Sequence, residues 1–152
     1  MSEWAVDAST RFVTQESSEA DRWMQAQLRY QSLLAQASQV WGHIGEALEC
    51  RIRSFNDRVG KEVLNVSVAS NRRLAAYAKM ASGRRGFCAD FDAGKCTIVC
   101  SAYSMDGTID FSERYGMAIN AGNQAAFTVP GGCECDAEQI AERMLNGLMG
   151  WK

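Results

Sequence analysis

The chain has 152 residues, of which 47% are hydrophobic and 22% charged, and its formal net charge at pH 7 is −2. This composition is too apolar for a disordered protein, and the length is typical of one domain with its own core. No stretch approaches the roughly 18 consecutive apolar residues of a membrane helix, and the first residues lack the basic and apolar regions of an export signal, so a cytoplasmic location is expected.

The charges are unevenly distributed along the chain. Residues 1–50 carry three basic and seven acidic side chains, residues 51–85 carry nine and two, and residues 86–152 carry four and nine. Segregation of this kind indicates a positively charged face. The interpretation that we favour is that basic and acidic elements lie side by side and screen each other.

A long amphipathic helix is predicted over residues 19–57. Residues 1–18 are interpreted as an N-terminal extension, with a disordered segment as one alternative. Ser18 and Asp21 resemble a capping box, and Gly60 is a plausible stop. Such a helix is about 55 Å long, whereas a strand of eight residues covers only about 26 Å. Either the helix breaks near Gly42 and Gly45, or its overhang packs on another subunit, which we favour. The predicted interface residues are Tyr30, Leu34, Trp41 and Leu48.

A change to a two-residue hydrophobic period after Gly60 predicts a series of strands. Asp106-Gly107 between apolar runs is typical of a hairpin turn. Residues 73–80 would also suit a short helix, because they are rich in alanine. A final helix begins after Asp136, which forms a capping box with Gln139. The predicted strands are residues 64–68, 73–80, 87–91, 96–103, 108–119 and 124–129.

This order of elements predicts an α+β fold in which a long N-terminal helix precedes an antiparallel meander of five or six strands and a C-terminal helix. Residues 19–152 would form a single two-layer domain, with the helices on one face of the sheet. The bulky side chains of the central strands cannot all be assigned to the covered face, so some would line a groove or a dimer interface on the open face. Core packing of all of them is the interpretation that we favour. These side chains are Val99, Tyr103, Phe111, Tyr115 and Phe127.

The six cysteines are expected to be reduced thiols, because no export signal precedes them. Cys96 and Cys100 would lie about 13 Å apart along a strand, too far to share one zinc ion. Cys133 and Cys135 are the more accessible pair, with redox activity as the sharper hypothesis and two incidental thiols as the other. Neither a metal site nor a cofactor is predicted.

Catalytic residues are not assigned either. His43, the only histidine, lies off the apolar stripe of the first helix, so a solvated side chain is expected rather than a base for a cysteine nucleophile. Several carboxylates are candidates for acid and base roles, but they lie in or near turns, where aspartate is favoured for backbone reasons. They are Asp90, Asp92, Asp106, Asp110 and Glu113.

Arginine pairs at the predicted strand ends favour a different function. If the basic segment gathers on one edge, Arg72, Arg73, Arg84 and Arg85 would bind the phosphates of nucleic acid or of a small anionic ligand. The sequence pI of about 5.4 counts against a dedicated nucleic-acid binder. Lys and Arg near the end of a helix are also explained by its dipole.

The sequence therefore favours a non-catalytic cytoplasmic interaction module. It would self-associate through its long helix, most simply as a dimer, and bind a protein or an apolar small molecule. Binding of nucleic acid or an anionic ligand through residues 51–85 is the first alternative. A small enzyme using thiol or carboxylate chemistry is the second.

Overall fold

The structure is a computed structural model, and it describes residues 2–151. By their contacts, the residues divide into two units, Met1–Ser32 and Leu33–Lys152. In the first unit, the described residues from Glu3 onward belong to helix α1 (Glu3–Val59). The helix therefore begins at Glu3 rather than near residue 19, and the predicted extension is largely helical. Neither glycine nor proline occurs in this unit, and Ser9 and Thr10 satisfy their hydroxyls by bonding back to the Val6 carbonyl.

In the second unit, α1 continues to Val59 without a break. Gly42 and Gly45 lie within it, so the predicted alternative of a broken helix is not observed. Gly45 faces the sheet, where a Cβ atom would lie 3.6 Å from the Leu74 side chain. The helix ends as predicted at Gly60, which adopts φ +84° and donates its N–H to the Asn56 carbonyl.

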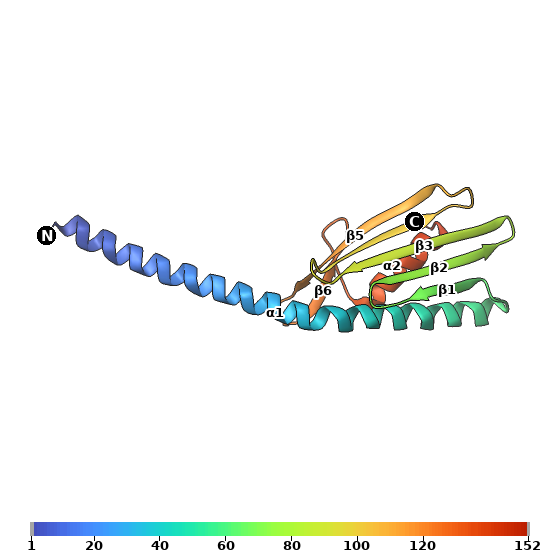
Figure 1. The fold of residues 1–152 in the computed structure, drawn as a ribbon, viewed down its shortest axis with the longest axis horizontal. Helices are drawn as coiled ribbons and strands as arrows, with labels where there is room; N and C mark the ends of the chain where they lie inside the picture. The colour runs from blue at the N-terminus through green and yellow to red at the C-terminus, as the bar shows by residue number, and fades with distance from the viewer. Residues whose placement is uncertain (1, 152) are drawn as a thin grey trace. The chain divides into compact units, whose positions relative to one another are not determined.

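The sheet is an antiparallel meander in which each strand pairs with its neighbours in the chain (Figure 1). Residues 73–80 form a strand rather than a helix. One strand more than predicted is present within the described residues, because Glu134 and Cys135 pair with the strand before them; two residues are too few for a periodic signal. The strands are β1 (Leu64–Ala69), β2 (Arg73–Met80), β3 (Gly83–Asp92), β4 (Thr97–Tyr103), β5 (Ile109–Ile119), β6 (Ala125–Thr128) and β7 (Glu134–Cys135).

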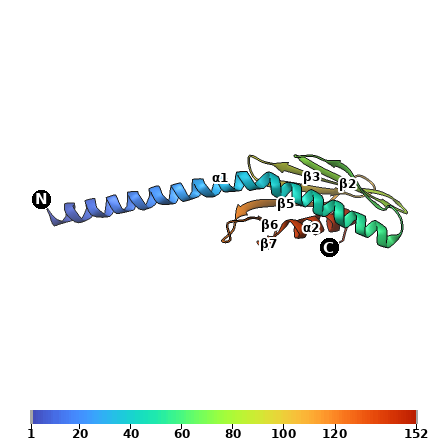
Figure 2. The same cartoon turned by 90° about the horizontal axis from the view of Figure 1, so that it is seen from below.

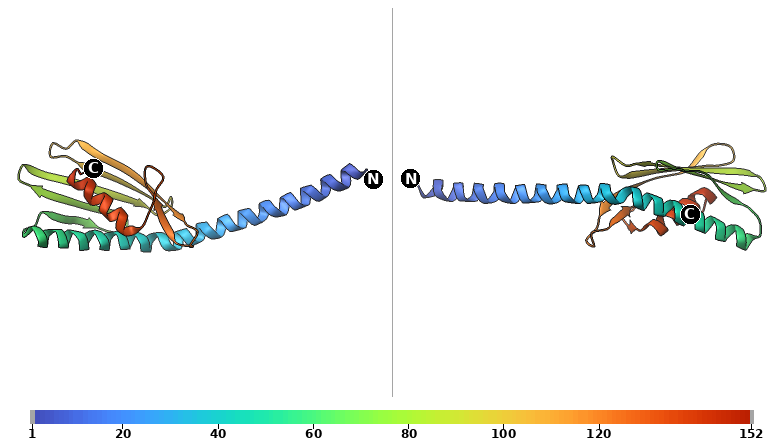
Figure 3. Two further views of the ribbon diagram at one scale, coloured as in Figure 1. Left: turned by 180° about the vertical axis from the view of Figure 1, so that it is seen from behind. Right: turned by 60° about the horizontal axis from the view of Figure 1, so that its bottom comes forward.

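The second unit has the two layers that the sequence predicts. The cyan-to-green part of α1 and the C-terminal helix α2 (Ala137–Met149) lie on the same side of the sheet (Figures 2 and 3). We call this side the inner face and the opposite side the outer face. Alternate residues of β2, β3 and β4 are buried on the inner face. They include Leu74, Ala76, Ala78, Phe87, Ala89, Phe91, Ile98, Cys100 and Ala102.

Aromatic stacking joins α1 to the sheet. The rings of Trp41 and Phe91 are stacked with centroids 5.1 Å apart, and the Trp41 indole N–H donates to the Ser70 carbonyl at 2.9 Å. A buried tryptophan needs a partner for its one polar group, and this carbonyl supplies it. The register of α1 on the sheet is therefore set by both packing and a hydrogen bond.

Helix α2 begins where the sequence predicts. The Asp136 side chain accepts a hydrogen bond from the Gln139 N–H, and the Gln139 side chain accepts one from the Asp136 N–H, each at 2.9 Å. This confirms the predicted capping box. Gly150 closes the helix at φ +74°.

Candidate functional site

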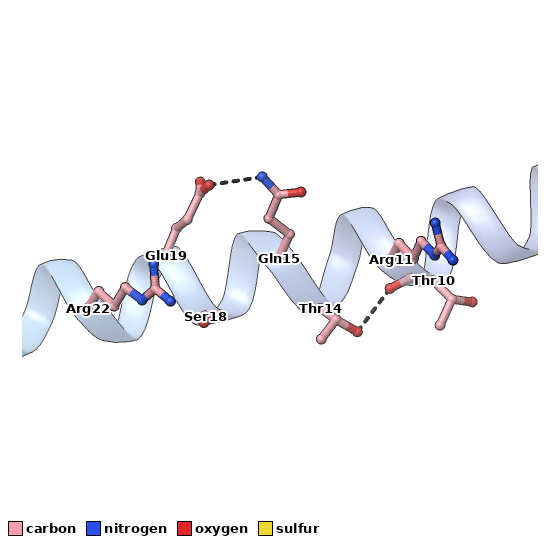
Figure 4. A pocket seen from close by; sticks show the side chains of 7 residues that line it. All are labelled: Thr10, Arg11, Thr14, Gln15, Ser18, Glu19 and Arg22. Atoms are coloured by element: carbon pink, nitrogen blue, oxygen red, sulfur yellow. Dashed lines mark hydrogen bonds between the residues drawn. The ribbon is translucent and has the colours of Figure 1, made fainter.

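The described surface of the first unit is a single helix, and it carries a shallow depression between Thr10 and Arg22 (Figure 4). Its side chains bond along the same helix: Gln15 donates to Glu19 at 3.1 Å, and Thr14 donates to the Thr10 carbonyl at 2.9 Å. One helix supplies no opposing wall. The depression is therefore a gap between neighbouring side chains and not a ligand site.

Large apolar side chains are exposed on two sides of this helix. At 100° per residue, an aromatic stripe made of Trp4, Phe12, Trp23 and Tyr30 falls within about 100° of arc. An aliphatic stripe made of Val6, Val13, Met24 and Leu28 lies on the other side. All eight side chains are exposed, Trp23 at 65% and Tyr30 at 47%. A helix that is apolar on two sides is normally buried by other elements.

The four predicted interface residues fall into two groups. Tyr30 and Leu34 are exposed, at 47% and 40%. Trp41 and Leu48 are 3% and 1% exposed, because they pack in the core of their own unit. In this fold, the second pair cannot contact another subunit.

The four predicted anion-binding arginines are not brought together. Arg72 is exposed at the turn before β2, and Arg73 forms an ion pair with Asp90 at 2.7 Å. Arg84 lies at the opposite end of the β2–β3 hairpin, where its position pairs with Lys79. Six residues of strand between these ends correspond to about 20 Å.

Arg85 points to the inner face instead, and its role is structural. It is buried, donates to the Leu148 carbonyl at 2.7 Å and forms an ion pair with Asp110 at 2.8 Å. The hydrogen bond from Arg85 holds the pKa of Asp110 below its ordinary value. The guanidinium thus ties the last turn of α2 to the sheet, where a cation also suits the helix dipole.

A pocket of about 620 Å³ opens between α2 and β5. Arg143 and Glu113 line the pocket and form a bidentate ion pair with donor–acceptor distances of 2.9 to 3.1 Å. Phe111 and Trp151 provide apolar walls. The charged groups of the lining are paired with each other or with Arg85, so the pocket suits a small, largely apolar molecule. Its lining residues are Asp110, Phe111, Glu113, Arg143, Asn146, Gly147, Gly150 and Trp151.

Beneath the Arg143–Glu113 ion pair, two reactive side chains are sealed in the core. Burial raises the pKa of the Tyr115 hydroxyl and of the Cys100 thiol far above their ordinary values, so both are protonated at neutral pH. Neither can act as a nucleophile there. Among the described residues, the Tyr115 hydroxyl finds no hydrogen-bond partner of good geometry, although Glu113 and Arg143 lie near enough to affect its pKa.

The remaining thiols are not assembled with a base. His43 and Cys50 are both exposed on α1, but seven residues of helix separate them by about 10 Å, beyond hydrogen-bond reach. Cys133 is exposed, and burial raises the pKa of Cys135. The described residues include all six cysteines, each as a free thiol, and hold no cluster of three metal-ligating side chains.

The candidate carboxylates serve structural roles. Asp90 pairs with Arg73, Asp92 accepts from the Lys95 N–H at 3.1 Å, and Asp106 accepts from the Thr108 N–H at 3.0 Å. Asp110 and Glu113 pair with arginines, as described above. The turn functions that the sequence suggested for aspartate therefore hold for Asp92 and Asp106.

Sequence reasoning missed the tyrosine pair on the outer face. Strand pairing places Tyr77, Gly86 and Tyr103 in one row across β2, β3 and β4. Two-residue alternation within each strand contained this signal, but the register between strands was needed to align the three residues.

Comparison with known proteins gives no relative: no family model, curated protein or solved structure matches the chain. Within residues 2–151, helices are either too short or too polar to span a bilayer. The candidate sites must therefore be judged on their own geometry.

Proposed function

We propose that the protein is a non-catalytic interaction module that self-associates through the N-terminal part of α1. The observation that carries this proposal is the exposure of the aromatic and aliphatic stripes between Trp4 and Tyr30. Exposed apolar side chains aligned on one side of a helix are typical of a surface that packs against a partner. A helix in a protein also gains most of its stability from packing its apolar face against another element.

A second copy is the partner that we favour. Complete burial of a large aromatic side chain removes about 150–250 Å² from solvent, and because these four are only 47% to 77% exposed, they offer roughly 500 Å² per copy. A standard interface takes about 800 Å² from each partner, and the aliphatic stripe supplies the remainder. Two copies that pair these helices would shield both stripes only in part. A dimer is the simplest assembly. A larger bundle would bury the parts of the two stripes that a dimer leaves exposed.

The pocket between α2 and β5 supports the second part of the proposal, binding of a partner molecule of apolar character. Phe111 and Trp151 would contact it, while the paired charges of the lining disfavour a highly charged ligand. We place this module in the cytoplasm, where its six thiols would remain reduced.

Self-association is tested by light scattering during size exclusion of the full chain. The double substitution Trp23→Glu with Tyr30→Glu puts two carboxylates on the aromatic stripe, and it is expected to convert the oligomer to monomer. Both side chains are exposed, so the second unit should retain its fold and its thermal transition. Measurements at low and high salt should agree, because apolar contacts are not screened.

A matched control carries the same change of charge on the same helix. Ser18→Glu with Gln25→Glu places both carboxylates off the two stripes, and this variant should remain oligomeric. A parent protein that is monomeric at tens of micromolar would overturn the proposal. So would an oligomer that both double variants leave intact.

A further inference from the structure

Within the described part of the second unit, neither helix covers the outer face of the sheet, and the centre of that face is made of side chains that are either small or apolar. Ala75, Cys88, Ser101 and Ser112 pair in one row across β2 to β5. The next row contains Tyr77, Gly86 and Tyr103, followed by Ile109. Along each strand, neighbouring rows are about 7 Å apart. The result is a shallow floor bordered on one side by two tyrosines.

Gly86 leaves space between those tyrosines. A Cβ atom at this position would meet nothing within 4 Å. Two strand spacings place the backbones of Tyr77 and Tyr103 about 10 Å apart. A planar ring in contact with aromatic carbons on both sides needs about 7 Å. The row therefore has room for one flat aromatic group over the glycine.

Cations surround the same row. The Arg84 guanidinium lies 4.4 Å from the centroid of the Tyr77 ring, and the Lys79 ammonium lies 5.9 Å from it. Arg114 lies on the far side of the floor in the row of Asp90 and Val99. Four cationic and two acidic side chains belong to this face in β2 to β5, so it is positive although the whole chain is not. They are Arg73, Lys79, Arg84, Arg114, Asp90 and Asp92.

We propose that this outer face binds single-stranded nucleic acid. Tyr103, with its exposed ring, and the Tyr77–Arg84 pair would stack on bases, because aromatic rings and guanidinium planes both accept a base face. Lys79, Arg84 and Arg114 would contact phosphates. These groups extend over about 20 Å of the sheet, which is enough for a few nucleotides.

Single strands fit this face better than a duplex or a plain polyanion. Stacking on Tyr103 requires a base that is free of its pairing partner. A polyanion without bases would use only the cations. On this face Asp90 neutralises Arg73, and Asp92 offsets one further positive charge. The proposed site differs from the arginine cluster predicted from the sequence, because it is an aromatic surface flanked by Lys79, Arg84 and Arg114. It involves none of the residues on which self-association is proposed to depend.

The test is fluorescence anisotropy with a labelled, mixed-sequence 12-nucleotide RNA in 50 mM and 200 mM salt. Three phosphate contacts predict a slope near −2 in log affinity against log salt, or about a 20-fold loss over this range. Tyr103→Leu, which keeps an apolar side chain but removes the ring, should weaken binding roughly tenfold. Tyr103→Phe should bind as the parent does.

The cations are tested separately. Arg84→Gln with Arg114→Gln should make the salt slope shallower by about 1.4. Arg53→Gln with Arg58→Gln, a matched loss of charge on α1, should leave the slope unchanged. Thermal melts identify any variant that fails to fold. The stripe variant of α1 should bind RNA like the parent, which separates this site from self-association.

Three results would overturn the proposal. The first is a parent protein that does not bind the RNA at 50 mM salt. The second is a folded Tyr103→Leu variant with unchanged affinity. The third is competition by inorganic polyphosphate as strong as competition by unlabelled RNA, because it would show that no base is stacked.

Discussion

At the residue scale, the most unusual group is the Tyr115 hydroxyl, which is enclosed in the core without a well-formed hydrogen bond among the described residues. A buried polar group left unpaired costs about 1–3 kcal/mol. Tyr115→Phe is therefore expected to raise the free energy of unfolding by about 1 kcal/mol in urea titrations. Tyr103→Phe, at an exposed hydroxyl, is the matched control and should change nothing. A clear destabilisation by Tyr115→Phe would contradict this account.

Asp106 predicts a pH dependence that is confined to acid. Hydrogen bonds from Ser104 and Thr108 lower its pKa from 3.8 to about 2. Because the folded form holds the proton less tightly than the unfolded chain, the carboxylate contributes stability above pH 4, and this contribution is lost as the pH falls toward 2. Asp106→Asn should flatten the stability curve in this window. Denaturation midpoints at pH 2, 3, 4 and 7 provide the measurement.

At the element scale, the approach of α2 to β5 depends on a residue without a side chain. A Cβ atom at Gly147 would lie 2.7 Å from the Phe111 ring, closer than real contacts allow. The helix tolerates the weak helix former because its absent side chain makes room for that ring. Packing therefore overrides intrinsic propensity at this position.

This contact predicts a change of sign in a double-mutant cycle. Gly147→Ala alone should destabilise the protein by about 1–2 kcal/mol, because overpacking exceeds the gain in helix propensity. With Phe111→Ala in place, the same substitution should be stabilising by about 0.5–1 kcal/mol. Urea unfolding of the four variants measures the coupling. Additive effects would show that the ring moves aside without cost.

At the scale of the whole molecule, the core resides in the second unit. Among the residues that the structure describes, the buried hydrophobic side chains run from Ala37 to Leu148, and the hydrophobic cluster includes none from the first unit. A chain starting at Leu33 is therefore expected to fold, with a melting temperature within a few degrees of that of the full protein. It should also be monomeric, because the aromatic and aliphatic stripes are removed. Calorimetry and light scattering test both expectations; a protein that loses its cooperative transition would contradict the first.

The repeat of apolar residues explains why a helix was predicted over residues 19–57, but it does not indicate which of the repeating side chains are exposed. Trp23, Tyr30, Ala37 and Ile44 follow one another at seven-residue steps, so the sequence contains one uniform stripe. Tyr30 is exposed, whereas Ala37 and Ile44 are buried. Periodicity reports that a face is apolar, but it does not report which surface covers that face.

The sequence by itself determined the order of elements, the α+β class, the strand alternation and the N-terminal cap of the last helix, because these depend on residues within a few positions of one another. Only the tertiary structure decided the features that depend on pairing between strands, namely which side chains become neighbours and on which face they lie. The register of β2, β3 and β4 aligned Tyr77, Gly86 and Tyr103 on the outer face. Because side chains alternate along a strand, Arg84 lies on the outer face and its neighbour Arg85 on the inner face. A shift of one residue would have exchanged the two faces, and local patterns do not contain that information.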